Sequence, residues 1–210
     1  MKKNLMIQLM VASSALMVMV ACGGQSKSTT GDNDSTAVEG MEIIEESTAQ
    51  ADVVKGELGL FDLRGPVKTC VTKVEGYKGE CKFDENGFVT VLNSKPLKEE
   101  YKKISRDEQG RLKHCSYDEY DETFCNYTVN EAGLLVEMED WPFMDCGAKC
   151  TYTYDDNCDM TQMTCESLGM DAEDGPQVFK YVIEERDTHG NWTRRTANGK
   201  SQTRTITYYE

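Results

Sequence analysis

The sequence predicts an all-β fold: an antiparallel meander of repeated β-hairpins, curled or two-layered, that follows a disordered tether. A short turn motif recurs along the chain between residues 57 and 210. The runs between these turns are rich in Thr, Val, Tyr and Phe and alternate in polarity, which is typical of half-buried strands. A flat sheet of this length would expose one apolar face, so we expect it to curl or to split into two layers.

Residues 1–21 have the organisation of an export signal. Lys2 and Lys3 precede a mostly apolar run from Leu5 to Val20, and small residues surround Cys22. The stretch resembles bacterial lipoprotein signal peptides, although Met19 stands where Leu, Val or Ile is usual. In that family the cysteine is diacylated and becomes the mature N-terminus, so the resemblance implies a fatty-acid (palmitate-type) anchor on Cys22. The alternative is a retained transmembrane anchor, since the run is barely long enough to cross a bilayer of about 30 Å.

Residues 22–56 are predicted to form a flexible acidic tether. The segment contains mainly Ser, Thr, Gly, Asp and Glu, so burial of apolar surface cannot offset its chain entropy. The signal resemblance implies a lipid-anchored protein of the bacterial cell envelope. Gly23 directly after Cys22, with no early acidic cluster, favours the outer membrane, on its periplasmic or surface face.

The charge of the chain excludes one class of partner. There are 37 acidic and 23 basic residues, giving a net charge of −14, and loss of Lys2 and Lys3 with the signal makes it about −16. Affinity for nucleic acid comes mainly from neutralising phosphates, so no nucleic-acid partner is expected. Anionic lipid headgroups would also repel this surface, which leaves the lipid chains to hold the protein on the membrane.

Five turns share one pattern, in which Asp or Asn is followed three residues later by Gly, or once by Cys158. The side chain of Asp or Asn can bind backbone N–H groups further along the turn, and Gly accepts a positive φ. This predicts four-residue hairpin loops with a type I turn and a glycine bulge. With Cys158 in the fourth position, we expect a distorted turn or a left-handed Asn157. The fourth positions are 87, 110, 133, 158 and 190, at intervals of 23, 23, 25 and 32, which indicates a repeated supersecondary unit.

A last hairpin is predicted at the C-terminus. Asn198-Gly199 is a strong two-residue turn signal between the strand-like runs 192–197 and 200–208. The hairpin gathers four basic residues, which we expect to offset neighbouring acidic strands or, alternatively, to dock an acidic partner. They are Arg194, Arg195, Lys200 and Arg204.

The turns between aromatic-bearing strands resemble YD (RHS-type) repeats in a degenerate form. The opening stretch Leu60–Val67 (LFDLRGPV) and the closing stretch Asp187–Arg194 (DTHGNWTR) resemble the ends of uncharacterised envelope lipoproteins that carry such repeats. The resemblance covers about residues 60–209. It implies a β-hairpin scaffold and no catalytic residues.

Eight cysteines remain after Cys22, an even number that favours disulfides in an exported domain. Free thiols and a zinc site are the alternatives, although the gaps between the last four contain no close pair of the kind that structural zinc sites use. Hairpin geometry can place Cys70 opposite Cys81 and Cys115 opposite Cys125. The other four are expected to pair among themselves in an unassigned order: Cys146, Cys150, Cys158 and Cys165.

No catalytic signature, metal motif or cofactor fingerprint is present. His114 and His189 are interpreted as structural or solvated. Trp141 and Phe143 lie beside carboxylates on what we expect to be a Pro-containing binding loop, or else they cover the apolar face of the sheet. The sequence therefore predicts a non-catalytic binding or scaffolding module for an envelope protein or glycan. The alternatives are an envelope hydrolase with an unrecognised carboxylate site and a purely structural spacer, which would lack an exposed apolar patch near Trp141.

Overall fold

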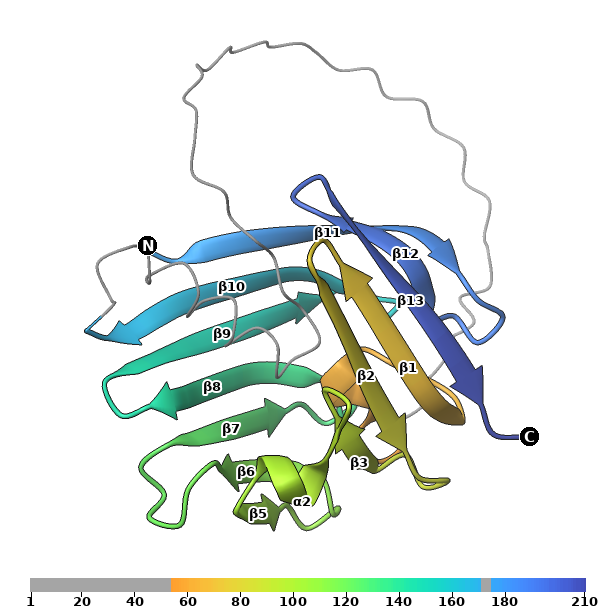
Figure 1. Ribbon diagram of the computed structural model, residues 1–210. Helices are drawn as coiled ribbons and strands as arrows, with labels where there is room; N and C mark the ends of the chain where they lie inside the picture. The colour runs from red at the N-terminus through yellow and green to blue at the C-terminus, as the bar shows by residue number, and fades with distance from the viewer. Residues whose placement is uncertain (1–53, 171–174) are drawn as a thin grey trace, which may run out of the picture. The chain divides into compact units, whose positions relative to one another are not determined.

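The computed structural model describes residues 54–170 and 175–210. Thirteen antiparallel strands form one sheet in the order β4-β3-β2-β1-β13-β12-β11-β10-β9-β8-β7-β6-β5 (Figure 1). The predicted all-β meander is therefore confirmed, while the signal peptide, Cys22 and most of the tether lie outside the described residues. The strands are β1 Val67–Val74, β2 Tyr77–Phe83, β3 Val89–Leu92, β4 Lys95–Pro96, β5 Lys103–Arg106, β6 Leu112–Ser116, β7 Phe124–Val129, β8 Leu135–Phe143, β9 Cys146–Tyr154, β10 Met160–Gly169, β11 Gln177–Arg186, β12 Trp192–Ala197 and β13 Lys200–Tyr208. Two short helices accompany them, η1 Leu58–Phe61 and α2 Leu97–Glu100.

The first strand pairs with the last in the interior of the sheet. β1 runs antiparallel to β13 from Val67 opposite Tyr208 to Val74 opposite Gln202. All other neighbours in the sheet are consecutive in the chain. As a result, the two edges of the open sheet are β4 and β5, which are joined directly by α2.

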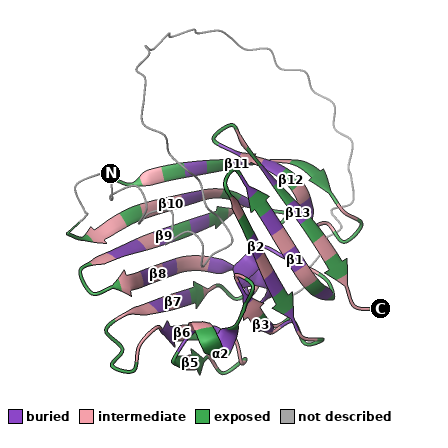
Figure 2. Ribbon diagram, in the orientation of Figure 1, coloured by how far each residue is buried: buried purple, intermediate pink, exposed green. Residues whose placement is uncertain are grey.

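The sheet curls so that its inner face forms one core. Buried positions alternate with more exposed ones along the strands (Figure 2). Inward side chains from distant strands, such as Phe83 on β2, Tyr127 on β7, Met163 on β10 and Ala197 on β12, belong to a single buried cluster. The period-two pattern places the apolar side chains on one face of the sheet, and the curl buries that face inside the domain.

A segment before the first strand fills the interior of the curl. Residues 57–63, which we call the plug, are all buried and contain η1. Leu58, Leu60, Phe61 and Leu63 are each at most 6% exposed. Burying such side chains contributes about 1.5–3 kcal/mol each, so the plug is part of the core.

The repeated turns adopt the predicted geometry and lie at one end of the sheet (Figure 1). They connect β2 to β3, β5 to β6, β7 to β8, β9 to β10 and β11 to β12. In four of them, the Oδ1 atom of the leading Asp accepts N–H groups from the second and fourth following residues. Asp84, for example, accepts from Asn86 and Phe88, both at 2.9 Å. The glycine in fourth position has a positive φ, as at Gly87, where φ is 80°. The turn chemistry predicted from sequence is thus confirmed.

The chain around the plug fastens these turns together. Its backbone and side chains reach the connections between β2 and β3, β7 and β8, and β11 and β12. The contacts are Val54 N–H to Ala132 O (3.1 Å), Glu57 N–H to Gly87 O (2.9 Å) and Arg64 N–H to Asn191 Oδ1 (2.7 Å). The repeat turns therefore hold the segment that closes one end of the core.

The prediction for the fourth repeat turn was wrong. Cys158 itself takes the left-handed conformation, with φ at 61°, and the turn is regular. Asp155 Oδ1 still accepts the N–H groups of Asn157 and Asp159, both at 3.0 Å. Two side-chain hydrogen bonds and the strand pairing on both sides fix the backbone, so the side chain at 158 accepts the strain.

Replacing Cys158 with Gly is expected to stabilise the domain. A non-glycine residue in the left-handed region costs about 1–2 kcal/mol, and glycine removes most of that cost. Glycine also makes the unfolded chain more flexible, which offsets part of the gain. The net gain should be about 0.5–1 kcal/mol in the free energy of unfolding, measured by denaturant titration under reducing conditions. Cys158→Ala serves as the control, because it removes the thiol and retains the strain. Equal stability of the two variants would contradict the explanation.

Candidate binding tip and interior polar network

Trp141 and Phe143 do not lie on a loop, contrary to the sequence-based prediction. Both belong to β8, which continues through Pro142 to Phe143. The register between β8 and β9 shifts between Asp140 and Phe143, and such a bulge accommodates the missing N–H of proline within a strand. Only Met144 and Asp145 connect β8 to β9.

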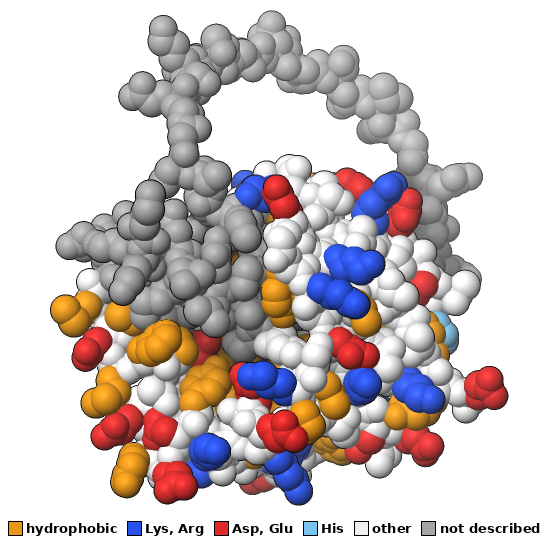
Figure 3. Space-filling view, viewed as in Figure 1, with side chains coloured by type: hydrophobic (Ala, Val, Ile, Leu, Met, Phe, Trp, Pro, Cys, Tyr) orange, Lys and Arg blue, Asp and Glu red, His pale blue; other side chains and the backbone are white. Residues whose placement is uncertain are grey.

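An apolar patch nevertheless lies at the end of this hairpin, opposite the repeat turns. Phe143 is 50% exposed, Met144 64% and Met170 77%; we call these three residues the tip. Met170 comes close because its N–H donates to Asp145 O at 2.9 Å. The preceding Gly169 permits this approach, since a Cβ there would lie 2.1 Å from that same carbonyl oxygen. Figure 3 shows hydrophobic side chains gathered at the left of the view, where β8, β9 and β10 have their ends.

A row of rings on the outer face of the sheet leads to the tip. The Trp141 and Phe124 rings lie 6.5 Å apart, and Phe124 lies 5.7 Å from the His114 ring. Trp141 donates from Nε1 to Glu139 Oε1 at 2.6 Å. Gly147 on β9 makes room for the indole, because a Cβ there would lie 2.6 Å from the ring. The row of rings therefore ends at Trp141, two residues before Phe143 of the tip.

The neighbouring connection between β6 and β7 presents another exposed ring. Tyr120 is 81% exposed. Asp118 organises this loop by accepting the N–H groups of Tyr120 and Thr123, both at 2.7 Å. The Thr123 hydroxyl and these N–H groups lower the pKa of Asp118 to about 2. The Asp118 carboxylate, which organises the loop, is therefore ionised throughout the physiological pH range.

The two histidines have structural partners, as predicted. His114 Nδ1 lies 2.7 Å from Asn126 Oδ1, and its Nε2 lies 2.8 Å from Asp121 Oδ1. His189 stacks on Tyr208, with the ring centroids 4.0 Å apart. His114 is partly exposed on the outer face, whereas Cys115 beside it is fully buried.

One disulfide is present among the described residues, between Cys150 and Cys165 on adjacent strands. It joins two of the four cysteines expected to pair among themselves. Cys158 is a free thiol, and so are Cys70, Cys81, Cys115 and Cys125. The two predicted hairpin pairs are therefore not bonded to one another in this structure. The register places Cys70 opposite Cys81 and Cys115 opposite Cys125, as the hairpin analysis predicted.

We expect oxidative folding to join Cys70 to Cys81 and Cys115 to Cys125. Burial raises the pKa of Cys81 and of Cys115 to about 12. Because the thiolate is the reactive form, these bonds should form before the core closes. Refolding with oxidised glutathione, followed by non-reducing peptide mapping, should recover both pairs. Oxidation of the folded reduced protein should recover few of them. Cys70 joined to any other cysteine would contradict the first pairing.

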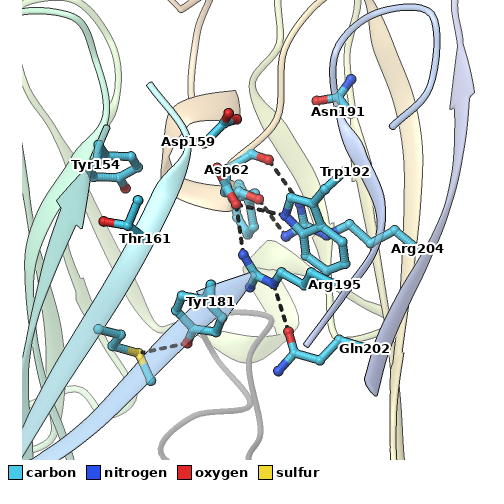
Figure 4. A network of polar contacts seen from close by, with 12 residues as sticks. Asp62, Tyr154, Asp159, Thr161, Tyr181, Asn191, Trp192, Arg195, Gln202 and Arg204 are labelled. Atoms are coloured by element: carbon cyan, nitrogen blue, oxygen red, sulfur yellow. Dashed lines mark hydrogen bonds and ion pairs between the residues drawn. The ribbon is translucent and has the colours of Figure 1, made fainter. Parts of the chain in front are cut away.

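A buried polar network holds the plug in the core, at the end opposite the tip (Figure 4). Asp62 Oδ2 accepts from Trp192 Nε1 at 2.8 Å and from Arg195 Nη1 at 3.0 Å. The Trp192 ring lies between two guanidinium groups, 4.0 Å from Arg195 and 3.8 Å from Arg204. Arg204 also donates to the backbone oxygens of Phe61 and Asp62, at 2.8 and 2.9 Å.

This network is structural. Burial lowers the pKa of Arg195 to about 10, so the side chain remains charged at neutral pH opposite Asp62. The cavity that Arg195 and Arg204 line beside Phe61 is about 10 Å³, which is room for about one water molecule and too small for a substrate. The charges therefore join the plug to β12 and β13.

The expectation that the four basic residues of the last hairpin offset neighbouring acidic strands was wrong for Arg195 and Arg204. Arg195 is 0% exposed and Arg204 6%, so neither can dock an acidic partner. Their partners are groups on the plug, which is distant in sequence. Arg194 behaves as expected, because it pairs with Glu184 and Glu185 on the neighbouring strand at 2.9 and 2.7 Å.

Within residues 54–170 and 175–210, no group of three or more His, Cys, Asp or Glu side chains is arranged to hold a metal ion. Over the same ranges, no helix has the length and apolar character needed to span a bilayer. The small interior cavity is lined by one carboxylate, Asp62, and a larger groove beside β3 and β5 by none.

No protein-family model matches the chain, and no curated protein matches it.

Sequence reasoning missed Met170 and Tyr120 as surface residues of interest, and within the segment 139–145 it singled out Trp141 and Phe143 but not Met144. Met144 sits in a two-residue connection that carries no Asn-Gly or Asp-Gly signal. Met170 becomes part of the tip only through the register of β10 with β9. The glycine before it was the available signal, since a glycine at the end of a strand often marks a close backbone approach.

Proposed function

We propose that this protein is a non-catalytic, lipid-anchored lipoprotein of the bacterial cell envelope that binds an envelope protein or glycan through the tip. The lipoprotein-like signal supports export and acylation at Cys22. The resemblance to degenerate YD repeats supports a scaffold role for the hairpins. The observation that carries the proposal is the exposed apolar patch next to Trp141, which a purely structural spacer would not need.

The chemistry of the tip suits a partner with both apolar and polar surface. Phe143, Met144 and Met170 are adjacent and more than half of their combined surface is open to solvent. Methionine side chains adapt to irregular surfaces, and aromatic rings stack on sugars or on apolar side chains. Contiguous exposed apolar residues of this kind are typical of interaction sites.

The binding proposal is tested by comparing two sets of variants. The mature domain is used as bait on intact envelopes and on a glycan array, with Phe143→Ser, Met144→Ser and Met170→Ser combined. Val182→Ser is the matched control, because Val182 is 62% exposed on β11 outside the tip. Wild type and control should capture the same partner, and the triple variant should lose it. No partner for wild type in either assay would contradict the proposal.

Anchoring is tested separately. Cells fed an alkyne-tagged palmitate should label the wild-type protein and leave Cys22→Ser unlabelled. The Cys22→Ser protein should also be absent from the outer-membrane fraction. A wild-type protein that keeps its initiator methionine and carries no lipid would overturn the anchored location and leave the binding test unaffected.

A further inference from the structure

The two edges of the sheet lie on either side of a groove that is separate from the tip. β4 and β5 end the strand order, and only α2 and two further residues connect them. Between β3, α2 and β5 lies a cavity of about 430 Å³, which we call the edge groove. This volume is within the range of sites that bind ligands.

Apolar side chains form the floor of the edge groove. Val89 and Leu97 are buried, and Ile104 is partly buried. Thr90 and Lys98 also line the groove and are exposed. An incoming chain could therefore place apolar side chains on the floor while its other side chains remain near solvent.

The backbone of the groove is open on the side of β5. Among the described strands, β5 pairs with β6 alone. On the opposite side, β3 pairs with β4 only at Val91 and Leu92, so Val89 and Thr90 extend past the last strand of the sheet. An edge of this kind offers N–H and C=O groups to an added strand.

One end of the groove is fixed by the plug. Glu57 accepts the N–H groups of Val89 and Leu112, both at 2.7 Å, and is ion-paired with Arg106. The Phe88 ring packs against the Arg106 guanidinium at 5.5 Å. The edges therefore cannot collapse onto one another at that end, and the groove is preorganised.

The charge of the groove is opposite to that of the protein. Lys98 and Arg106 line it and are exposed, Lys102 is exposed directly before β5, and no carboxylate from the described part of the chain lines the groove. The net charge of the whole chain is −14. Lys98 and Lys102 form no ion pair with any carboxylate of the described residues. A local basic rim on an acidic protein favours an acidic ligand and disfavours a basic one.

We propose that the edge groove binds an extended acidic peptide, which adds to the sheet as a strand beside β5. Successive side chains of an extended chain point to opposite faces. Apolar residues at alternate positions fill the cavity above Leu97 and Ile104. The acidic residues between them stay at the solvent-exposed mouth of the groove, where the long side chains of Lys98 and Lys102 can reach them. The ligand is thus a segment in which apolar and acidic residues alternate, and it binds at a surface other than the tip.

The test uses the full-length protein in detergent and fluorescein-labelled ten-residue peptides, with binding measured by fluorescence anisotropy. A peptide of alternating Val and Glu should bind. The same sequence with Lys in place of Glu should bind at least tenfold more weakly. A Val-Glu peptide that is N-methylated at alternate residues should lose binding, because it cannot complete the strand pairing. Equal binding of either comparison peptide, or no binding of the first, would overturn the proposal.

Variants locate the binding to the groove. Thr90→Trp should fill the cavity, and Lys98→Glu with Lys102→Glu should reverse the rim charge; each should weaken binding at least tenfold. Lys73→Glu with Lys180→Glu is the matched control, because both lysines are exposed on other strands. Unchanged affinity in the groove variants, or an equal loss in the control, would overturn the location. All substituted residues are exposed, so melting temperatures should stay close to that of wild type.

Discussion

Asp62→Ala is expected to lower the free energy of unfolding by about 3–5 kcal/mol, the usual cost of removing one partner from a buried ion pair. Arg195 is 0% exposed and its charge is balanced by Asp62 at 3.0 Å. The same oxygen accepts from the indole N–H of Trp192. The substitution leaves both donors buried without this partner. It also places Ala in the left-handed conformation, since φ is 55° at Asp62, which adds strain.

The measurement is denaturant unfolding followed by tryptophan fluorescence, to which the buried Trp192 contributes. Asp62→Asn is the matched variant, because Asn tolerates the left-handed conformation and keeps an oxygen acceptor. It should lose clearly less than Asp62→Ala. A double-mutant cycle with Arg195→Gln should show a coupling energy above about 1 kcal/mol, as contacting buried pairs do. A loss below about 1 kcal/mol in Asp62→Ala would show that the network does not hold the plug.

Glu57→Ala is expected to cost a similar amount, about 3 kcal/mol or more. The carboxylate is 0% exposed, and it joins β3, β5 and β6 through two backbone N–H groups and Arg106. Its removal leaves these donors without their acceptor at the point where the sheet edges meet. Glu131→Ala is the control, since Glu131 is exposed in a repeat turn and should change stability by less than about 0.5 kcal/mol.

The Glu57 effect should also depend on pH in a specific direction. Burial raises the pKa of Glu57 above its ordinary value of 4.5. A carboxyl group whose pKa is raised on folding contributes most stability below its unfolded pKa, and this contribution is lost as the pH rises through the folded value. The advantage of wild type over Glu57→Ala should therefore be larger at pH 4 than at pH 7. The reverse trend would mean that the ion pair with Arg106 outweighs the cost of burial.

Local features of the fold were predictable because their causes are local. An Asp or Asn three residues before Gly sets a turn through its own side chain, and Asn198-Gly199 sets the last hairpin with both residues at positive φ. Strand alternation then fixes which side chains face inward. The opposition of Cys70 and Cys81 followed from a turn at Gly76 and from this alternation.

Features that depend on long-range contact could not be derived in this way. The plug has the composition of a short apolar strand, and its helical turn is determined by the core around it. Arg195 and Gln202 occupy inward positions of β12 and β13, where the alternation rule expects apolar residues. They are tolerated because Arg195 Nε donates to Gln202 Oε1 at 2.8 Å and Asp62 balances the charge. Asp62 lies more than a hundred residues before Arg195 in the sequence, so no local pattern could indicate this pair.

The candidate site shows the same division. The aromatic residues Trp141 and Phe143 stood out by type, while their place on a strand was concealed by Pro142. The exposure of the tip depends on the register among β8, β9 and β10 and on the close approach at Gly169. The edge groove had no local signal, since it exists only because β4 and β5 are left as the ends of one curled sheet.

The pairing of β1 with β13 has a consequence for biogenesis. As the chain leaves the ribosome or a translocation pore, β1 emerges well before the strand that completes it, and a long loop must close before the two can meet. During that interval β1 has an unpaired edge that is prone to aggregation, and a holding chaperone would need to shield it. A premature stop at codon 200 would remove only eleven residues, yet both β1 and β12 would lose the strand that pairs with them. Quality-control proteases should therefore degrade such truncated chains quickly.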